Sequence, residues 1–533
     1  MSRPRVLAAC TLIVAAAAFT SLASAQTTYA PKYIPFNDSF GLNLSGMPAL
    51  QQDFNNDGIP DVTNGEFPTV EMLSTGAGNY HVIDSSGGAV ASGDFNNDGK
   101  ADYLLYTQGP NYHSFSGTGG TLTQPFYVAY GNGSGQFTVK NAPALPGLTA
   151  GAAVLGRATD INGDGRADLL LLYYNASTSK VSLHVWLNNG NGFTDKGSAY
   201  SFAIASGLSL GGIQQNFDYT SPFDLLLGDF DGDGHADVAI RVLTSNTGGS
   251  SGPSGSSLIV LYGGGNAAFT PKTVFLNRGD EPVFAAADMN DDGRSNLVAT
   301  DVDGSLRYFR SNAGRTFTEA VISATTLSHS LWFQFPPILA DFDGNGYKDI
   351  AFSALSTDPT SNQAGVRVLY QTASHTWLLG AFAAADTFNE QRDWQPFDDV
   401  LGGDYNHDGK PDVALFATGY ANTHPNSADL MLNTGSKPVG SCAAPAIGIH
   451  VCSPGASSAS PVKFSFSATS FYPLRKMEVW VDGVKESETY HVFANQGFSD
   501  VSLTLAAGTH TVSLFAGTFD GGVIKKTISM KVP

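Results

Sequence analysis

The chain has 533 residues and a formal net charge of −19 at pH 7, from 47 acidic and 28 basic side chains. That acidity argues against nucleic acid as a partner, because nucleic-acid-binding domains are usually basic. Only 14% of the residues are charged, which excludes a disordered polyelectrolyte. The 60 glycines and 11% aromatic residues suit a β protein with many tight turns, and the length predicts several domains or a repeat array.

Residues 1–25 resemble a secretory signal peptide. Arg3 and Arg5 precede an apolar run, and an Ala-Ser-Ala sequence before Gln26 provides a small-residue cleavage site. A Leu-Ala-Ala-Cys sequence ending at Cys10 resembles a lipoprotein signal, but most of the apolar run follows it. No other stretch has the roughly 20 apolar residues that a membrane span needs. We therefore expect a protein that is secreted or held in the cell envelope, without a transmembrane segment.

A nine-residue motif occurs seven times and is the strongest signal in the chain. The copy at Asp229–Asp237 reads Asp-Phe-Asp-Gly-Asp-Gly-His-Ala-Asp. Oxygen-bearing side chains at positions one, three, five and nine suit a hard cation such as calcium, which takes six to eight oxygen ligands. Glycine at position six permits the positive φ angle of a tight loop. The alternative is a set of hydrogen-bonded Asx turns without metal.

We call the seven copies of this motif the acidic loops and number them in chain order. Together they predict up to seven bound calcium ions. Ligand charge tunes calcium affinity, so we expect the fourth loop, with four carboxylates, to bind most tightly. The fifth loop has only two carboxylates and is expected to be the weakest or empty. The predicted ligands, loop by loop, are Asp53, Asn55, Asp57 and Asp61; Asp94, Asn96, Asp98 and Asp102; Asp160, Asn162, Asp164 and Asp168; Asp229, Asp231, Asp233 and Asp237; Asp288, Asn290, Asp292 and Asn296; Asp341, Asp343, Asn345 and Asp349; and Asp404, Asn406, Asp408 and Asp412.

Each acidic loop lies between two short apolar runs, which predict strands a and b of a β unit. Position two is apolar in every copy, so its side chain is expected to pin the loop to a core. Downstream, an apolar strand, a turn rich in glycine and asparagine and an aromatic residue recur, as in Trp186–Phe193. This pattern predicts a hairpin of strands c and d. Four-stranded units repeated four to eight times are typical of β-propellers.

The motif and the following hairpin turn resemble the FG-GAP and VCBS repeats. That resemblance covers about 400 residues and implies the seven-bladed, all-β propeller of integrin α-chains and of many bacterial secreted proteins, here over residues 26–436. It also implies that position seven offers its backbone carbonyl to the ion. Residues 27–36 resemble the predicted strand d at Phe269–Phe275 and are expected to complete the last blade, closing the sheet edge. The alternative places them next to the strand before Asp53.

Loops at the face opposite the acidic loops are long and varied, which favours ligand binding there. The candidate ligand-face residues are aromatic side chains and one histidine, which could stack on sugars or bury in a protein interface: Tyr112, His113, Tyr219, Trp332, Phe335 and Trp394. The alternative is that they pack between blades. Catalysis finds little support, because acids such as Asp398 and Asp399 fit a solvated loop and no nucleophile motif is present.

The sequence changes character after residue 436. Residues 437–446 form a short linker. The alternating strands expected in residues 447–533, among them separate strands at 462–468 and 477–481, indicate a small β-sandwich that resembles bacterial Ig-like domains. Cys442 and Cys452 are an even pair in an exported chain, which favours a local disulfide.

The sequence therefore predicts a calcium-binding propeller that binds or adheres to a polysaccharide or a surface protein. The alternatives are a polysaccharide-active enzyme such as a lyase and a scaffold without a small ligand.

Overall fold

The computed structural model describes residues 28–35, 50–55, 57, 59–63, 69–76, 78–85, 88–108, 124–150, 152–164, 166–175, 177–206, 208–210, 223–246, 253–278, 283–290, 292, 294–300, 305–323, 336–345, 347–355, 364–372, 374–385, 399–417, 427–435, 442, 443, 445, 448–518 and 523–533. These residues form β-strands and no helix, so this part of the chain is all-β. Consequently, no helix within it is long and apolar enough to cross a membrane.

In the described residues, seven antiparallel sheets of four or five strands precede a C-terminal sheet, and we number each of the seven by the acidic loop that it contains. Sheet 1 contains β2 (Leu50–Gln52), β3 (Asp61–Thr63), β4 (Thr69–Gly76) and β5 (Asn79–Ser85). Sheet 2 contains β6 (Gly88–Gly93), β7 (Asp102–Tyr106), β8 (Phe126–Gly131) and β9 (Phe137–Asn141). Sheet 3 contains β10 (Val154–Thr159), β11 (Asp168–Asn175), β12 (Lys180–Asn188) and β13 (Phe193–Ala203). Sheet 4 contains β14 (Leu208–Leu210), β15 (Phe223–Gly228), β16 (Asp237–Asn246), β17 (Pro253–Gly263) and β18 (Phe269–Arg278).

The remaining sheets repeat this order. Sheet 5 contains β19 (Val283–Ala287), β20 (Asn296–Thr300), β21 (Leu306–Asn312) and β22 (Thr316–Ser323). Sheet 6 contains β23 (Ile338–Ala340), β24 (Asp349–Leu355), β25 (Ala364–Gln371), β26 (Trp377–Leu379) and β27 (Ala383–Ala384). Sheet 7 contains β28 (Asp399–Gly403), β29 (Asp412–Ala417), β30 (Ser427–Asn433) and, from the other end of the chain, β1 (Tyr29–Pro35).

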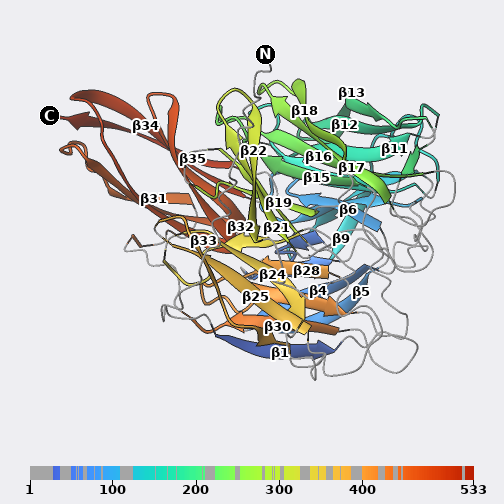
Figure 1. The fold of residues 1–533 in the computed structure, drawn as a ribbon, viewed down its shortest axis with the longest axis horizontal. Helices are drawn as coiled ribbons and strands as arrows, with labels where there is room; N and C mark the ends of the chain where they lie inside the picture. The colour runs from blue at the N-terminus through green and yellow to red at the C-terminus, as the bar shows by residue number, and fades with distance from the viewer. Residues whose placement is uncertain are drawn as a thin grey trace, which may run out of the picture.

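The N-terminal strand β1 pairs antiparallel with β30 and lies beside it in Figure 1. This is the position expected for residues 27–36, and it differs from the alternative position in sheet 1. Pro31 and Pro35 are tolerated because β1 is the edge strand of its sheet, where a missing N–H removes no ladder bond on the open side.

Hydrophobic clusters lie between neighbouring sheets. Sheets 2 and 3, for example, share a cluster that includes Leu104 and Trp186, both fully buried. A further cluster joins sheet 7 to sheet 1, where Val62 and Met72 pack with Tyr405 and Leu430. The strands that precede the first six acidic loops also contact one another in sequence: β2, β6, β10, β15, β19 and β23. This arrangement of four-stranded sheets is consistent with a β-propeller, as Figure 1 illustrates.

The apolar side chain at position two pins every acidic loop to a core, as the sequence predicts. Each of these side chains is at most 5% exposed, and each contributes roughly 1.5–3 kcal/mol of burial energy. The seven residues are Phe54, Phe95, Ile161, Phe230, Met289, Phe342 and Tyr405.

Side-chain amides tie neighbouring sheets together at the same level. Asn188 of sheet 3 donates one Nδ2 hydrogen to the carbonyl oxygen of Phe95 in the second loop over 2.9 Å. Asn433 of sheet 7 reaches Phe342 over the same distance, and Gln371 of sheet 6 donates to Met289 over 3.1 Å. The loop at one sheet is therefore fixed by the end of the third strand in the next sheet.

The C-terminal sheet contains β31 (Gly448–Ser453), β32 (Val462–Val481), β33 (Val484–Leu503), β34 (Gly508–Thr518) and β35 (Val523–Val532). Its strands differ from the prediction, which separates 462–468 from 477–481. In the structure both stretches belong to β32, which changes its neighbour from β31 to β34 after a register shift between Thr469 and Leu474. Such a bulge bends a strand without ending it.

Candidate metal loops

All seven acidic loops share one pattern of hydrogen bonds. The N–H at position five donates to the carboxylate at position one over 3.0–3.3 Å. The N–H at position seven donates to the side-chain oxygen at position five over 2.7–3.1 Å. The second bond closes an Asx turn, in which a short polar side chain accepts from the backbone two residues on. At position six, Gly99, Gly234 and Gly409 have φ angles of 78°, 87° and 82°, as the motif requires.

The residue at position nine is a buried connection between the loop and two strands. In the seventh loop, Asp412 is fully buried at the start of β29. Its Oδ2 accepts from the N–H of Tyr405 over 2.9 Å, and its Oδ1 accepts from the N–H of Asn433 over 2.7 Å. The same two bonds recur at the position-nine aspartates of five other loops, namely Asp61, Asp102, Asp168, Asp237 and Asp349.

Burial makes these carboxyl groups hard to ionise without a compensating cation. It raises the pKa of Asp61 to about 9, an effect to which the charges of Asp53 and Asp57 add and which backbone donors oppose. Burial also raises the pKa of Asp349 to about 9, with further contributions from Asp343 and Asp341. At position nine of these loops, a negative charge is therefore disfavoured unless a cation offsets it.

Two loops bring three carboxylates together closely enough to share an ion. Asp341, Asp343 and Asp349 of the sixth loop each have an oxygen within 4.8 Å of the others. Asp229, Asp231 and Asp233 of the fourth loop meet the same condition. An oxygen-only set fits calcium, since hard cations prefer carboxylate and carbonyl ligands. The sixth loop also has a neutral residue, Tyr347, at position seven.

Basic residues at position seven form ion pairs within several other loops. Lys410 Nζ lies 2.9 Å from Asp408 in the seventh loop, and Arg166 lies 3.2 Å from Asp164 in the third. Both pairs are partly exposed, so they contribute little to stability.

The fifth loop departs from the others in the way that its sequence suggests. Asn296 occupies position nine, and its Oδ1 accepts from the N–H of Met289 over 3.1 Å and from the Tyr308 hydroxyl over 2.7 Å. Arg294 pairs with Asp292 over 2.7 Å, and Arg310 lies 3.5 Å from the same carboxylate. Two guanidinium groups therefore neutralise one of its two carboxylates.

Two basic side chains from distant parts of the sequence contact the fourth loop, and the motif alone does not predict them. Lys485 of β33 forms an ion pair with Asp229, and both side chains are 1% exposed. Arg315, from the turn between β21 and β22, lies 2.8 Å from Asp231. No local pattern indicates Lys485, because 256 positions separate it from Asp229.

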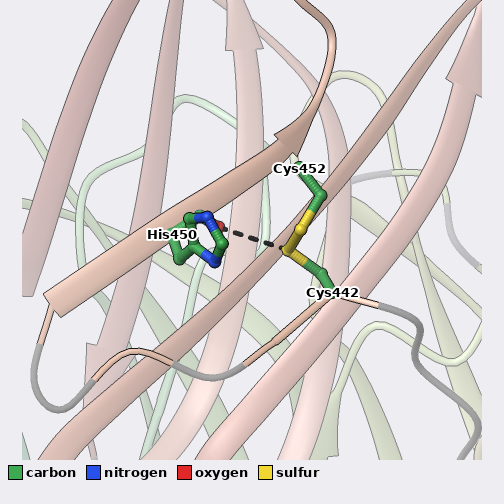
Figure 2. Close-up of side chains that lie close together, drawn as sticks. All are labelled: Cys442, His450 and Cys452. Atoms are coloured by element: carbon green, nitrogen blue, oxygen red, sulfur yellow. Dashed lines mark hydrogen bonds between the residues drawn. A yellow bond between two sulfur atoms is a disulfide. The ribbon is translucent and has the colours of Figure 1, made fainter.

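The predicted disulfide between Cys442 and Cys452 is present, with the Cα atoms 5.6 Å apart. Figure 2 shows His450 beside it, with its carbonyl oxygen 3.7 Å from Cys442 Sγ. These three residues could be taken for a metal site by proximity. However, metal binding by cysteine needs a thiolate, and both sulfurs are bonded to each other. The cluster is therefore a covalent connection between residues before β31 and that strand.

The six candidate ligand-face residues lie outside the described residues: Tyr112, His113, Tyr219, Trp332, Phe335 and Trp394. The same holds for Asp398, whereas Asp399 is the first residue of β28.

Several solved structures resemble this chain at low sequence identity. BBS1N in complex with ARL6DN is 11% identical, with a TM-score of 0.40, over 76% of this chain and 98% of that one. An exo-beta-1,3-galactanase from Phanerochaete chrysosporium is 10% identical, with a TM-score of 0.27, over 70% and 94%. The Aleuria aurantia lectin is 14% identical, with a TM-score of 0.29, over 54% and 81%. Among curated proteins, no match to the chain is found.

A family model, the FG-GAP-like repeat, matches residues 94–171, 160–240 and 288–352. Each match begins at position one of an acidic loop and ends shortly after position nine of the next loop. The chain therefore contains FG-GAP-like repeats, and in the structure each match covers two consecutive acidic loops and the strands between them.

Proposed function

We propose that this protein is a secreted, calcium-binding, seven-bladed β-propeller with an Ig-like C-terminal domain, and that it binds a polysaccharide or a surface protein. The convergence of Asp341, Asp343 and Asp349 in the sixth loop is the observation that carries the calcium assignment. The FG-GAP-like repeats support it, because their loops repeat the same oxygen positions. The cluster between sheet 7 and sheet 1 supports a closed ring of seven blades.

Calcium in this proposal is structural. Residues at positions one, three, five and nine would hold the ion, which would supply positive charge where burial otherwise disfavours carboxylates. The ion would stabilise a loop that is already fixed to two neighbouring strands. Binding of an external ligand would then use the opposite face, where the variable loops and their aromatic residues lie in the sequence-based assignment.

Calcium binding can be tested by isothermal titration of the metal-free chain. We expect Asp343→Asn to reduce the number of bound ions or to weaken one class of sites. Asp500→Asn is a suitable control, because Asp500 pairs with Lys463 on the surface of the C-terminal sheet. Equal titrations of the wild type and Asp343→Asn would contradict the assignment to the sixth loop.

The ligand class can be tested with a glycan array, with calcium and after its removal. Calcium-dependent retention of a polysaccharide would support the binding function, and release of shorter sugars would support a lyase or hydrolase instead. If neither occurs, pull-down of surface proteins separates adhesion from a scaffold role.

Export can be tested by N-terminal sequencing of the protein recovered outside the cytoplasm, which should begin at Gln26.

A further inference from the structure

We propose that the fourth acidic loop is the docking socket of the C-terminal sheet, and that Lys485 takes the place of a metal ion there. Lys485 lies near the start of β33, directly after the Asp482-Gly483 turn and Val484. Its ammonium group contacts Oδ2 of Asp229, the residue at position one of the loop. Both side chains are 1% exposed, so this pair is sealed inside the contact between the two parts of the chain.

The rest of Asp229 is already engaged by its own loop. Oδ1 accepts from the N–H of Gly232 over 2.7 Å and from that of Asp233 over 3.1 Å. Oδ2 accepts from the N–H of Gly234 over 3.0 Å in addition to the ammonium group. A buried ion pair is stable only when further hydrogen bonds satisfy its remaining polar atoms, and this carboxylate meets that condition.

A tryptophan completes the socket beside Lys485. Trp480 of β32 is the partner of Lys485 across the hairpin. Its indole packs against Gly234, where an added Cβ would lie 2.0 Å from the ring. Its Nε1 donates to Glu478 over 2.7 Å, and Glu478 also pairs with Lys476 over 2.5 Å. The glycine at position six therefore serves the interface as well as the loop, because a residue with a Cβ would leave no room for the ring.

The docked arrangement leaves little room for calcium at this loop. A divalent ion at this loop would compete with the ammonium group for the carboxylate of Asp229, and the two cations would repel each other at short range beside two buried side chains. Arg315 also neutralises Asp231, and its guanidinium lies 4.7 Å from the Tyr262 ring centre. The loop with the most carboxylates is therefore specialised for contact within the chain, and we expect its calcium affinity to be the lowest among the loops with at least three carboxylates.

The contact is not confined to one loop. Strand β33 also contacts β23 of sheet 6 and β28 of sheet 7. In Figure 1, β32 and β33 run from the rest of the C-terminal sheet towards the middle of the group formed by the seven other sheets. Lys485 and Trp480 thus fix the position of a hairpin whose strand β33 contacts several sheets. Displacement of the Lys485 ammonium group by a metal ion would therefore affect the placement of the whole C-terminal sheet.

Terbium luminescence tests the socket directly, since terbium occupies calcium sites and emits when a nearby tryptophan is excited. The proteins are the full mature chain, Lys485→Gln, and the control Lys463→Gln, which changes a lysine of β32 whose side chain is 57% exposed. Each is also prepared with Trp480→Phe, which identifies the emission that depends on this ring.

We expect Lys485→Gln to gain Trp480-dependent emission of severalfold and one additional bound ion per chain, with no gain in the control. Equal Trp480-dependent emission from the wild type would overturn the proposal, because the ion would then bind with Lys485 present. A Lys485→Gln variant without extra binding would also overturn it. Emission that persists in Trp480→Phe comes from ions at the other loops. The general calcium assignment is therefore tested by this emission, separately from the test of the fourth loop.

A double-mutant cycle provides a second readout that does not depend on metal. Asp229→Asn, Lys485→Gln and the double variant are compared by thermal unfolding in metal-free buffer. Because the two groups are in contact, the decrease in melting temperature of the double variant should be clearly smaller than the sum of the single decreases. Additive decreases would show that the two residues do not act together.

Discussion

The N–H of Thr434 donates to the carbonyl oxygen of Thr28 over 2.8 Å, although 406 positions separate these residues in the chain. The bond continues the ladder between β30 and β1, in which Tyr29 faces Asn433 and Pro35 faces Ser427. The two ends of the repeat region are therefore joined by an antiparallel strand pair.

Removal of residues 26–36 should lower the melting temperature by several degrees. Sheet 7 would lose its outer strand and expose the polar backbone edge of β30. A synthetic peptide of residues 27–36, added in trans, should restore the melting temperature in a concentration-dependent way. The same peptide with Ile34→Asp should not, because Ile34 is 6% exposed within the cluster between sheets 7 and 1. An unchanged melting temperature after truncation would contradict closure by β1.

Asp412→Ala should strongly destabilise the metal-free protein. It leaves the buried N–H groups of Tyr405 and Asn433 without their acceptor, at a cost of about 1–3 kcal/mol for each. Asp500→Ala removes an exposed pair with Lys463 and should cost about 1 kcal/mol or less. Denaturant unfolding without calcium measures both, so that loss of an ion plays no part. Similar midpoints for the two variants would refute the connecting role of position nine.

Asn188→Ala should weaken the contact between sheets 2 and 3. The Nδ2 group donates to Phe95 over 2.9 Å and to Ala167 over 3.1 Å, so its removal costs about 1–3 kcal/mol. The neighbouring Asn189 donates to Thr194 at the surface, and Asn189→Ala should change stability by about 0.5 kcal/mol at most. Equal stabilities of the two alanine variants in chemical denaturation would argue against a role of Asn188 in holding sheets 2 and 3 together.

Stability in the absence of metal should fall as the pH rises from about 5 to 9. The folded protein holds the pKa of Asp61 and Asp349 near 9, above the ordinary value of about 3.9. A raised carboxyl pKa contributes stability that is complete below the ordinary value and is lost as the pH passes the folded value. Calcium binds the ionised form, so its contribution should grow over the same range. Melting curves with and without calcium at pH 5 and pH 8 check this, and a difference independent of pH would contradict it.

The repeated part of the fold could be predicted because its signals are local. Phe230 follows Asp229 directly, and its burial is readable from the apolar character of position two in every copy. The pairing of β1 with β30 was predictable because the N-terminal sequence resembles the outer strand at β18, including a proline that suits an edge.

Other features depend on contacts that no short window of sequence contains. Asp412 accepts a hydrogen bond from the N–H of Asn433, 21 positions away in the chain. In the sequence, Asp412 therefore resembles an ordinary metal ligand, and its role as a connection between strands is not visible. Charge counting ranks the fourth loop first for calcium, but Lys485 reaches that loop from a different sheet. The long β32 was also missed, because a bulge and a change of neighbour look like the end of one strand and the start of another.

Scanning calorimetry of the mature chain, with excess calcium and after complete removal of calcium, measures how much bound calcium stabilises the folded protein. An ion bound only by the folded state contributes about 2.7 kcal/mol per site when its concentration is 100 times the dissociation constant. With several such loops, we predict a large drop in melting temperature after removal and its recovery when calcium is added back. Identical melting temperatures in the two states would contradict calcium binding by the acidic loops, which would then be Asx turns that need no ion.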